Sequence, residues 1–402
     1  IENCCPILKT MLSLKSLKHT RPFFLVGFGL LIVIITTLSI LINSQQTEIR
    51  TVMTQNETVQ NRLASVSAQL KTLQSEDQYK INQDLKTEIG NIQKTYKKAV
   101  TTYENLLKVK EISKNTKGFD AQFAKALTLL VDRNYKDAET ELSDLGKKIQ
   151  DETDKVSSTF SIPADVKVNN APPSGGFARQ QVNADTGSYL VDIVSADLGS
   201  TRVIVDTASD SDCGNGCPVL PLGEYVSRNG GFAGVNGSYF CPEAYPSCAG
   251  KTNSYDTLLM NKNKHYFNSD NNKYSTVPAV IFLSGSIRFV GQSLEWGRDT
   301  GIDSMIANQP LLLSGGNIVF GGDGDPKKGS KGSRSFVGNK GSTIYIGVVH
   351  NATVAEVAHV LKTLGLENAL NLDSGGSTAL WYGGYKAGPG RNIPNAIVFV
   401  RR

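Results

Sequence analysis

The pattern of hydrophobic positions divides the chain of 402 residues into segments of different character. Residues 23–42 form an uninterrupted apolar run without a charged side chain. As a helix, this run is long enough to span the roughly 30 Å hydrocarbon core of a bilayer. Basic residues between Lys9 and Arg21 precede the run, which predicts a cytoplasmic tail over 1–22 and a C-terminal side outside the membrane. The alternative is a cleaved signal peptide, although its apolar region is usually shorter.

A polar, helix-favouring segment follows at residues 43–155. Apolar residues recur every three or four positions over 49–73 and, after an interruption, over 81–100. This heptad-like spacing predicts a coiled-coil-like stalk with a stutter or break at the interruption, and homo-oligomerisation through the stalk is an expectation. A pair of shorter helices is predicted within 118–150. Residues 156–176 are rich in Pro, Gly and Asn and are predicted to be a linker.

Residues 177–402 alternate short β-like runs with Gly-rich turns. Turn signals at 284–286 and 314–317 predict two hairpins. A helix is predicted at 353–364, because the Thr-Val-Ala-Glu at its start is a capping box and a glycine follows its last apolar position. A strand is predicted at 369–372. The predicted class is therefore α+β, a largely β C-terminal domain with few helices, preceded by a single transmembrane helix and an α-helical stalk.

The net charge and the two N-terminal cysteines bear on which partners are expected. The formal net charge is +5, but part of the excess precedes the apolar run, and the C-terminal half has no basic block interleaved with aromatic residues. A nucleic-acid partner is therefore not expected. Cys4 and Cys5 fall on the predicted cytoplasmic side, where free thiols or lipidated residues are expected.

The other four cysteines fall on the predicted outer side, where disulfides persist. Four cysteines allow three pairings, and proximity in the sequence favours Cys213–Cys217 and Cys241–Cys248. A zinc site is not expected, because neither pair has CxxC spacing and the histidines lie far from both pairs in the sequence.

Asp373 is the first candidate for a chemical role. It follows the predicted strand 369–372 and precedes Gly375 and Gly376, so ligand groups can approach the backbone closely. Successive N–H groups in such a turn can bind an anion. An ordinary turn, in which the aspartate binds its own backbone, explains the same residues. Local chemistry alone leaves both interpretations open.

Four motifs occur in the order found in a known family. They are Gly-Val-Asn-Gly-Ser-Tyr-Phe at 234–240, Arg-Ser-Phe-Val-Gly at 334–338, Asn-Leu-Asp-Ser-Gly-Gly-Ser-Thr at 371–378 and Arg-Asn-Ile-Pro-Asn-Ala at 391–396. Together they resemble the phosphodiester glycosidase family over the C-terminal domain. The resemblance implies a hydrolase that cleaves a sugar 1-phosphodiester, such as a GlcNAc-1-phosphodiester. Ser374 departs from the family turn, which often has glycine there, and His350 is a second departure.

The implied reaction decides which residue types are needed. A phosphate monoester is a stable leaving group, so the main requirement is a carboxylate near the anomeric carbon. Arginine suits the phosphate, because its planar fork matches two phosphate oxygens. The predicted catalytic residues are Asp373, Arg334 and Glu243, and the predicted substrate-binding residues are Asn236, Gly237, Gly375, Gly376, Ser377, Arg391 and Asn392.

Two further stretches of the sequence offer additional candidates for the site. The acidic residues of 206–212 form a solvated loop in the simplest interpretation. They also offer Asp206 as an alternative second carboxylate, or a place for a hard cation such as Ca²⁺ in a metal-dependent phosphodiesterase. No other cofactor is expected. The Gly- and Lys-rich stretch 321–332 is expected to be a loop bordering Arg334, with lysines that steer an anionic polymer.

The resulting hypothesis is a membrane-anchored, extracytoplasmic hydrolase that acts on a sugar-phosphate polysaccharide of the cell envelope. The envelope substrate follows from the predicted location and not from any residue of the site. The alternative is a non-catalytic surface module that binds anionic glycans. The sugar, the aglycone, the second catalytic group and the stereochemical course are left open.

Overall fold

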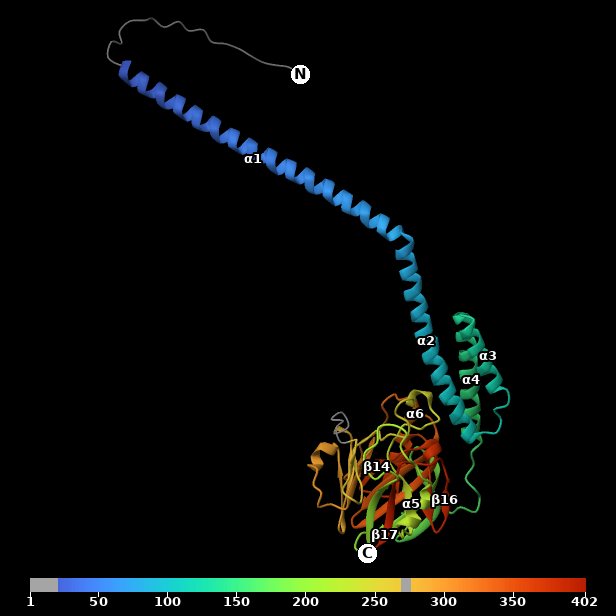
Figure 1. The fold of residues 1–402 in the computed structure, drawn as a ribbon. Helices are drawn as coiled ribbons and strands as arrows, with labels where there is room; N and C mark the ends of the chain where they lie inside the picture. The colour runs from blue at the N-terminus through green and yellow to red at the C-terminus, as the bar shows by residue number, and fades with distance from the viewer. Residues whose placement is uncertain (1–20, 269–275) are drawn as a thin grey trace. The chain divides into compact units, whose positions relative to one another are not determined.

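The computed structural model describes residues 21–268 and 276–402 (Figure 1). The first 20 residues of the predicted cytoplasmic tail, including Cys4 and Cys5, lie outside the described residues. Contacts divide the chain into two units, residues 1–90 and residues 91–402.

The first unit contains α1 (Arg21–Ser75) and the beginning of α2 (Asp77–Ile112). Within the described residues, α1 is the one helix long and apolar enough to cross a membrane. A membrane anchor and an N-terminal signal sequence share this character. The predicted interruption of the stalk is confirmed, since α1 ends and α2 begins on either side of Glu76. Large side chains of the apolar stripe, such as Val52 and Leu63, are exposed, and their pairing in an oligomer stays a prediction.

The predicted helix pair consists of α3 (Phe119–Val131) and α4 (Tyr135–Thr159), which pack against the second half of α2. Asn134 caps α4, because its side chain accepts a hydrogen bond from the N–H of Asp137. The buried contacts between the three helices come from apolar residues at helical spacing: Ala99, Leu106, Val109, Ala126, Leu142, Leu145 and Ile149. The end of α2 is thus fixed by side-chain packing within the second unit.

Three antiparallel sheets make up most of the second unit. The largest has the strand order β1 (Gly176–Ala184), β2 (Gly187–Asp197), β13 (Thr343–Ala352), β12 (Gly332–Lys340), β14 (Asn368–Asn371), β10 (Leu311–Ser314) and β11 (Asn317–Ile318). The second has the order β16 (Tyr385–Ala387), β15 (Leu380–Tyr382), β4 (Ala233–Asn236), β17 (Asn395–Arg401) and β3 (Thr201–Thr207). The third has the order β6 (Tyr266–Phe267), β5 (Leu259–Met260), β9 (Ser304–Ala307), β7 (Ala279–Leu283) and β8 (Ser286–Val290).

Short helices complete the β domain. They are α5 (Leu222–Arg228), α6 (Pro326–Gly329) and α7 (Val354–Thr363), together with the 3₁₀ turns η1 (Pro246–Cys248), η3 (Ser293–Trp296) and η4 (Gly375–Ser377).

The main core lies between the inner faces of the sheets, and strands of all three sheets contribute to it. In β2, Val194 and Ala196 face this core, whereas Val191 and Ile193 face the opposite side, as the two-residue period of a strand requires. α7 packs on that opposite side of the largest sheet, and α5 packs on the second sheet. Because helices cover these faces, the loops at the strand ends are the places left for a site.

The predicted α+β class, with a β-rich C-terminal domain, is confirmed. Both predicted hairpins are present, as β7–β8 and β10–β11. The capping box of α7 is complete, because the Thr353 hydroxyl accepts from the N–H of Glu356 and the Glu356 carboxylate accepts from the N–H of Thr353. α5 was not expected, since a helix of seven residues is too short to show a clear period.

Replacing Thr353 by alanine removes the side-chain acceptor at the start of α7. We expect the free energy of unfolding of the β domain to fall by about 1 kcal/mol. The change is measurable by chemical unfolding of the full chain in detergent, followed by tryptophan fluorescence, because both tryptophans, Trp296 and Trp381, lie in this domain. Thr353→Ser keeps the hydroxyl and serves as the control. An equal loss in both variants would contradict the capping role.

Candidate active site

Asp373 directly follows β14, and two backbone contacts from the second sheet fix its position. Its N–H donates to the carbonyl of Gly237, at 3.0 Å. Its carbonyl accepts from the side-chain amide of Asn236, at 2.6 Å. The N–H of Leu372, the residue before it, donates to Ser335 of β12. The predicted carboxylate is therefore placed where the largest sheet meets the second sheet.

Asn236 supports this turn from within the protein. Its side chain is completely buried, and its carbonyl oxygen accepts from the hydroxyl of Ser335, at 2.7 Å, and from the N–H of Ala379, at 3.1 Å. Because this amide is already bonded to three protein groups, the structure gives Asn236 a positioning role in place of the predicted contact with sugar. Gly237 is similar, since a Cβ atom there would collide with Asn395.

Burial dominates the electrostatics of Asp373. Desolvation raises the pKa of its carboxyl to about 6, and the negative charge of Asp256 contributes in the same direction. Hydrogen bonds from the Ser377 side chain and from the N–H of Ser374, together with the charge of Arg391, act against this rise. A carboxyl with such a pKa changes protonation state close to neutral pH, as a catalytic acid or base must.

Asp256 is a second carboxyl that the sequence analysis did not find. Burial raises its pKa above the ordinary value, and its charge influences Asp373. Its N–H donates to the carbonyl of Tyr239, at 3.1 Å. Asp256 belongs to no sequence motif, so only its position in the folded chain identifies it as a candidate site residue. Two nearby carboxyls with raised pKa values are a pattern expected of acid–base sites.

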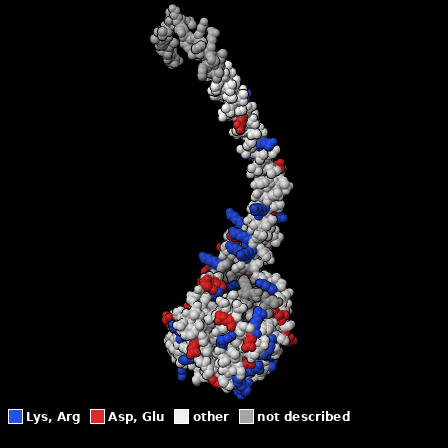
Figure 2. Space-filling view, turned by 90° about the vertical axis from the view of Figure 1, so that its left-hand side faces the viewer, with Lys and Arg blue, Asp and Glu red and all other residues white. Residues whose placement is uncertain are grey.

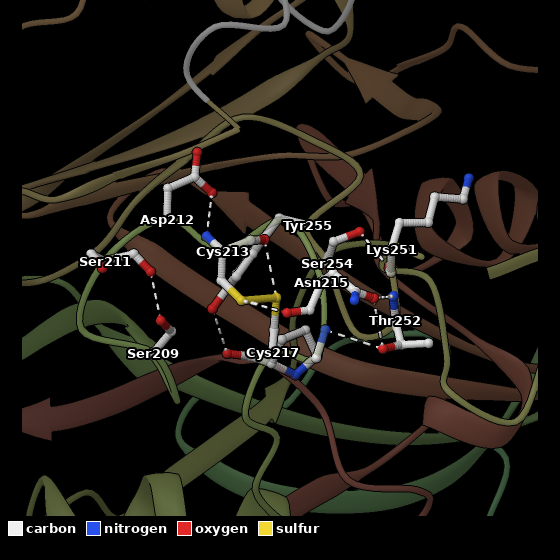
Figure 3. The surroundings of a disulfide bond; sticks show 12 residues. Ser209, Ser211, Asp212, Cys213, Asn215, Cys217, Lys251, Thr252, Ser254 and Tyr255 are labelled. Atoms are coloured by element: carbon white, nitrogen blue, oxygen red, sulfur yellow. Dashed lines mark hydrogen bonds between the residues drawn. A yellow bond between two sulfur atoms is a disulfide. The ribbon is translucent and has the colours of Figure 1, made fainter. Parts of the chain in front are cut away.

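Both predicted disulfides are present, and they hold the segment that leads to Asp256. In the Cys213–Cys217 loop, Asn215 accepts from the N–H of Thr252, at 2.9 Å (Figure 3). In the Cys241–Cys248 loop, Cys241 exchanges two backbone hydrogen bonds with residues 253 and 254. Each disulfide loop therefore anchors the same short stretch of chain, just before the second carboxyl.

Arg391 lies against the glycine turn. Its N–H donates to the carbonyl of Gly376, at 2.7 Å. Its guanidinium lies 5.2 Å from the ring centroid of Tyr245 and forms an ion pair with Glu111 of α2, at 2.5 Å. The backbone of Gly375 has φ of +65°, which favours glycine, and the space around its Cα is open. The structure thus brings Asp373, Gly376, Ser377 and Arg391 together, as predicted.

Arg334 is buried, with 8% of its surface exposed. Its guanidinium donates to the carbonyls of Ala352, at 3.1 Å, of Lys327, at 2.9 Å, and of Ser330. It therefore holds the Gly- and Lys-rich loop that was predicted to border it. Desolvation lowers its pKa, while Tyr239, Asp325 and Asp373 oppose this change. A role for Arg334 in binding phosphate stays a prediction.

The order of motifs, the capped helix and the carboxyl turn all point to one family. Residues 229–400 match the profile of the phosphodiester glycosidase family. The chain carries a phosphodiester glycosidase domain. No curated protein matches the chain.

Two solved structures are similar to the chain at low identity. A hypothetical protein from Synechocystis has 15% sequence identity and a TM-score of 0.45, with 56% of this chain and 62% of that chain covered. The catalytic domain of zebrafish N-acetylglucosamine-1-phosphodiester alpha-N-acetylglucosaminidase has 17% identity and a TM-score of 0.45, with 59% of this chain and 87% of that chain covered. This chain thus spans less than two thirds of the length of the Synechocystis protein.

Two predicted residues of the glycosidase domain do not join Asp373. Glu243 is exposed, and its backbone N–H donates to Asn253. Asn392 is also exposed. Among the contacts of residues 21–268 and 276–402, none joins either side chain to the Asp373 carboxyl. A catalytic role for Glu243 stays a prediction, whereas the charge of Asp256 does act on Asp373.

The acidic stretch 206–212 has its own partners. Asp206 is 2% exposed and forms ion pairs with Arg228, at 2.7 Å, and Lys262, at 3.2 Å. Asp212 accepts from the N–H groups of Cys213 and Asn268. In the part of the chain that the structure describes, no group of three or more His, Cys, Asp and Glu side chains is arranged to hold a metal. Asp206 therefore has a structural role between β3, α5 and the chain that follows β5.

His350 belongs to a hydrogen-bonded network around the buried carboxylate of Asp192 in the glycosidase domain. Its Nε2 atom lies 2.8 Å from the carboxylate of Asp192, which Arg179 also binds through two hydrogen bonds of 2.7 Å. Burial raises the pKa of Asp192, but the hydrogen bonds from Arg179 and His350 outweigh it and lower the pKa overall. Ser333, next to His350, accepts through its carbonyl from Thr378, which follows η4. The network supports the sheet behind the turn.

Asp373→Asn is expected to stabilise the folded chain at pH 7. Because the pKa of Asp373 rises from 3.8 to about 6 on folding, the folded state binds more protons than the unfolded state between these values. The Asp373 contribution to stability therefore falls as the pH rises from about 4 to 6. A shift of about two pKa units sets an upper limit of about 3 kcal/mol on the gain from removing this charge.

Urea unfolding of the full chain in detergent at pH 7 and pH 4, followed by tryptophan fluorescence, measures this effect. The gain should be present at pH 7 and small at pH 4. Asp165→Asn, at an exposed position, is the control and should change the free energy of unfolding by less than about 0.5 kcal/mol. A loss of stability at both pH values in Asp373→Asn would contradict the burial of a charged carboxylate.

Proposed function

We propose that the glycosidase domain hydrolyses a sugar 1-phosphodiester of the GlcNAc-1-phosphodiester type, and releases the free sugar and a phosphate monoester. The observation that carries this proposal is the partly desolvated carboxyl of Asp373, with Asp256 as a second carboxyl and Arg391 as a cation beside it. The family match at residues 229–400 supports a hydrolase of this class.

The proposed reaction breaks the bond between the anomeric carbon and the phosphate oxygen. The bonding electrons leave with the phosphate, and the oxygen of water forms the new bond to the anomeric carbon. Asp373, as a carboxylate, stabilises the positive charge that develops on the sugar, or bonds to the anomeric carbon and is then displaced from it by the water oxygen. The proton from water passes to a carboxylate, a role that Asp256 fits because burial raises its pKa. Arg391 binds the departing phosphate.

The proposed location is the outer surface of a cell membrane, with α1 as the anchor and the N-terminus in the cytoplasm. Two disulfides in the glycosidase domain support an oxidising compartment. On the face of the globular part shown in Figure 2, acidic and basic side chains are interspersed, and no extended surface of one sign is visible. An envelope sugar-phosphate polymer is the proposed substrate.

Hydrolysis of a synthetic GlcNAc-1-phosphodiester by the full chain in detergent tests the proposal. The value of kcat/KM, measured from the release of reducing sugar and phosphomonoester, should rise as the pH increases through about 6, because Asp373 must lose its proton. We expect Asp373→Asn to lower kcat by at least about 100-fold. Asp256→Asn is expected to lower kcat and to change the pH profile, whereas Asp165→Asn should keep the wild-type rate.

Three results separate this proposal from its alternatives. Binding of the phosphodiester without release of sugar would favour a non-catalytic glycan-binding module. Loss of activity in EDTA, restored by Ca²⁺, would favour a metal-dependent phosphodiesterase. An unchanged rate in Asp373→Asn would show that the site has been assigned to the wrong carboxyl.

A further inference from the structure

The last turns of α2 contribute charged residues to the surroundings of Arg391. Glu104, Lys108 and Glu111 are four and three positions apart, so they lie along one face of the helix. Glu104 is buried, with 8% of its surface exposed, and accepts from the N–H of Ser247, at 3.1 Å. Glu111 forms the ion pair with Arg391. One face of this stalk helix therefore rests on the loop and the turn that build the site.

Lys108 lies between these two acids in the sequence, and its partner is an aromatic ring. Its ammonium is 5.7 Å from the ring centroid of Tyr245, the same ring that Arg391 approaches to 5.2 Å. Within residues 21–268 and 276–402, it forms neither a hydrogen bond nor an ion pair. Burial lowers the pKa of Lys108, as do the positive charges of Lys327 and Arg391, while Glu104 and Glu111 oppose them. The cations of Lys108 and Arg391 thus lie against the same ring, and within the described residues Arg391 is paired with Glu111 while Lys108 forms no ion pair.

Glu111 occupies the space that faces the glycine turn. A Cβ atom built on Gly376 would collide with both carboxylate oxygens of Glu111 and with the guanidinium of Arg391. The carboxylate is therefore an anion held between Arg391 and the turn that follows Asp373. Its side chain keeps 37% of its surface exposed, so it can move into solvent without breaking a packed core. A phosphate bound to Arg391 at this turn would take the same place.

We propose that the end of α2 forms one wall of the phosphate-binding site, where Lys108 binds the phosphate of the substrate and Glu111 competes with it for Arg391. This proposal rests on the proposed function, because it takes the anionic ligand to be a phosphate mono- or diester. When phosphate enters, Glu111 releases Arg391 and turns to solvent, and the phosphate gains Lys108 as a second cation. A phosphate is the inferred ligand because Lys108 and Arg391 are cations on the same ring, and because the carboxylate of Glu111 now pairs with Arg391.

The two residues should affect binding in opposite directions, although they are one turn apart on the same helix. We expect Glu111→Gln to tighten binding about tenfold, because the competing negative charge is removed. Lys108→Ala should weaken binding about tenfold, and Lys108→Arg should restore most of the affinity. Lys110→Ala is the matched control, because Lys110 is on α2 but its ammonium pairs with Asp120. It should leave the affinity unchanged.

Isothermal titration of the full chain in detergent with N-acetylglucosamine 1-phosphate, and with inorganic phosphate alone, measures these affinities. The midpoint of thermal unfolding of each variant verifies that it is folded. Weaker binding in Glu111→Gln would overturn the competition and make Glu111 a part of the binding or catalytic machinery. Unchanged binding in Lys108→Ala would overturn the role of α2 as a wall of the site.

Failure of this inference can be told apart from failure of the proposed function. The titrations require no turnover, so opposite effects of Glu111→Gln and Lys108→Ala without any hydrolysis would leave the phosphate site in place and reject only the reaction. Hydrolysis that depends on Asp373, with equal phosphate affinity in all α2 variants, would keep the reaction and reject only the role of α2.

Discussion

The amide of Asn236 joins the two sheets that carry the site, and the position of Asp373 depends on it. Asn236 ends β4 in the second sheet, while its three partners are Ser335 of the largest sheet, the carbonyl of Asp373 and the N–H of Ala379. A buried amide with all these bonds formed is rigid, and removing it would leave several buried polar groups unpaired. The hydrogen bonds of Asn236 therefore fix the backbone at Asp373, and this backbone in turn positions the Asp373 carboxyl.

The charges around that carboxyl oppose one another. Burial makes Asp373 easier to protonate, and Arg391 and two hydrogen bonds make it harder. Glu111 takes part of the charge of Arg391 away from Asp373, since a guanidinium shared between two carboxylates favours each of them less strongly. The protonation of Asp373 and the occupancy of Arg391 are thus linked, so a ligand that displaces Glu111 also changes the environment of the carboxyl.

Local signals in the sequence predicted the capped helix, the two hairpins and the Asp373 turn, but not α5. The capping box at Thr353 predicted α7, and the closeness of the cysteines in the sequence predicted both disulfides. A strand followed by two glycines predicted the Asp373 turn. Residues that meet only in the folded chain were missed or assigned otherwise. Asp256 and Lys108 lie in stretches without a motif. Asn236 and Arg334 were taken for ligand-binding side chains. The Asn236 amide bonds the backbone of Asp373 and Ala379 and the hydroxyl of Ser335, and the Arg334 guanidinium donates to the carbonyls of Lys327, Ser330 and Ala352.

The Cys241–Cys248 disulfide restrains the loop that carries Tyr245. The ring that lies against both Lys108 and Arg391 is carried by the loop that Cys241 and Cys248 close, and η1 is the one regular element within that loop in the described structure. Closing the loop limits the conformations open to the tyrosine. Oxidation of two thiols is therefore a step in the assembly of the site. A chain whose thiols stay reduced would lack this constraint on the tyrosine, so the compartment of folding bears on how firmly the ring is held beside Arg391.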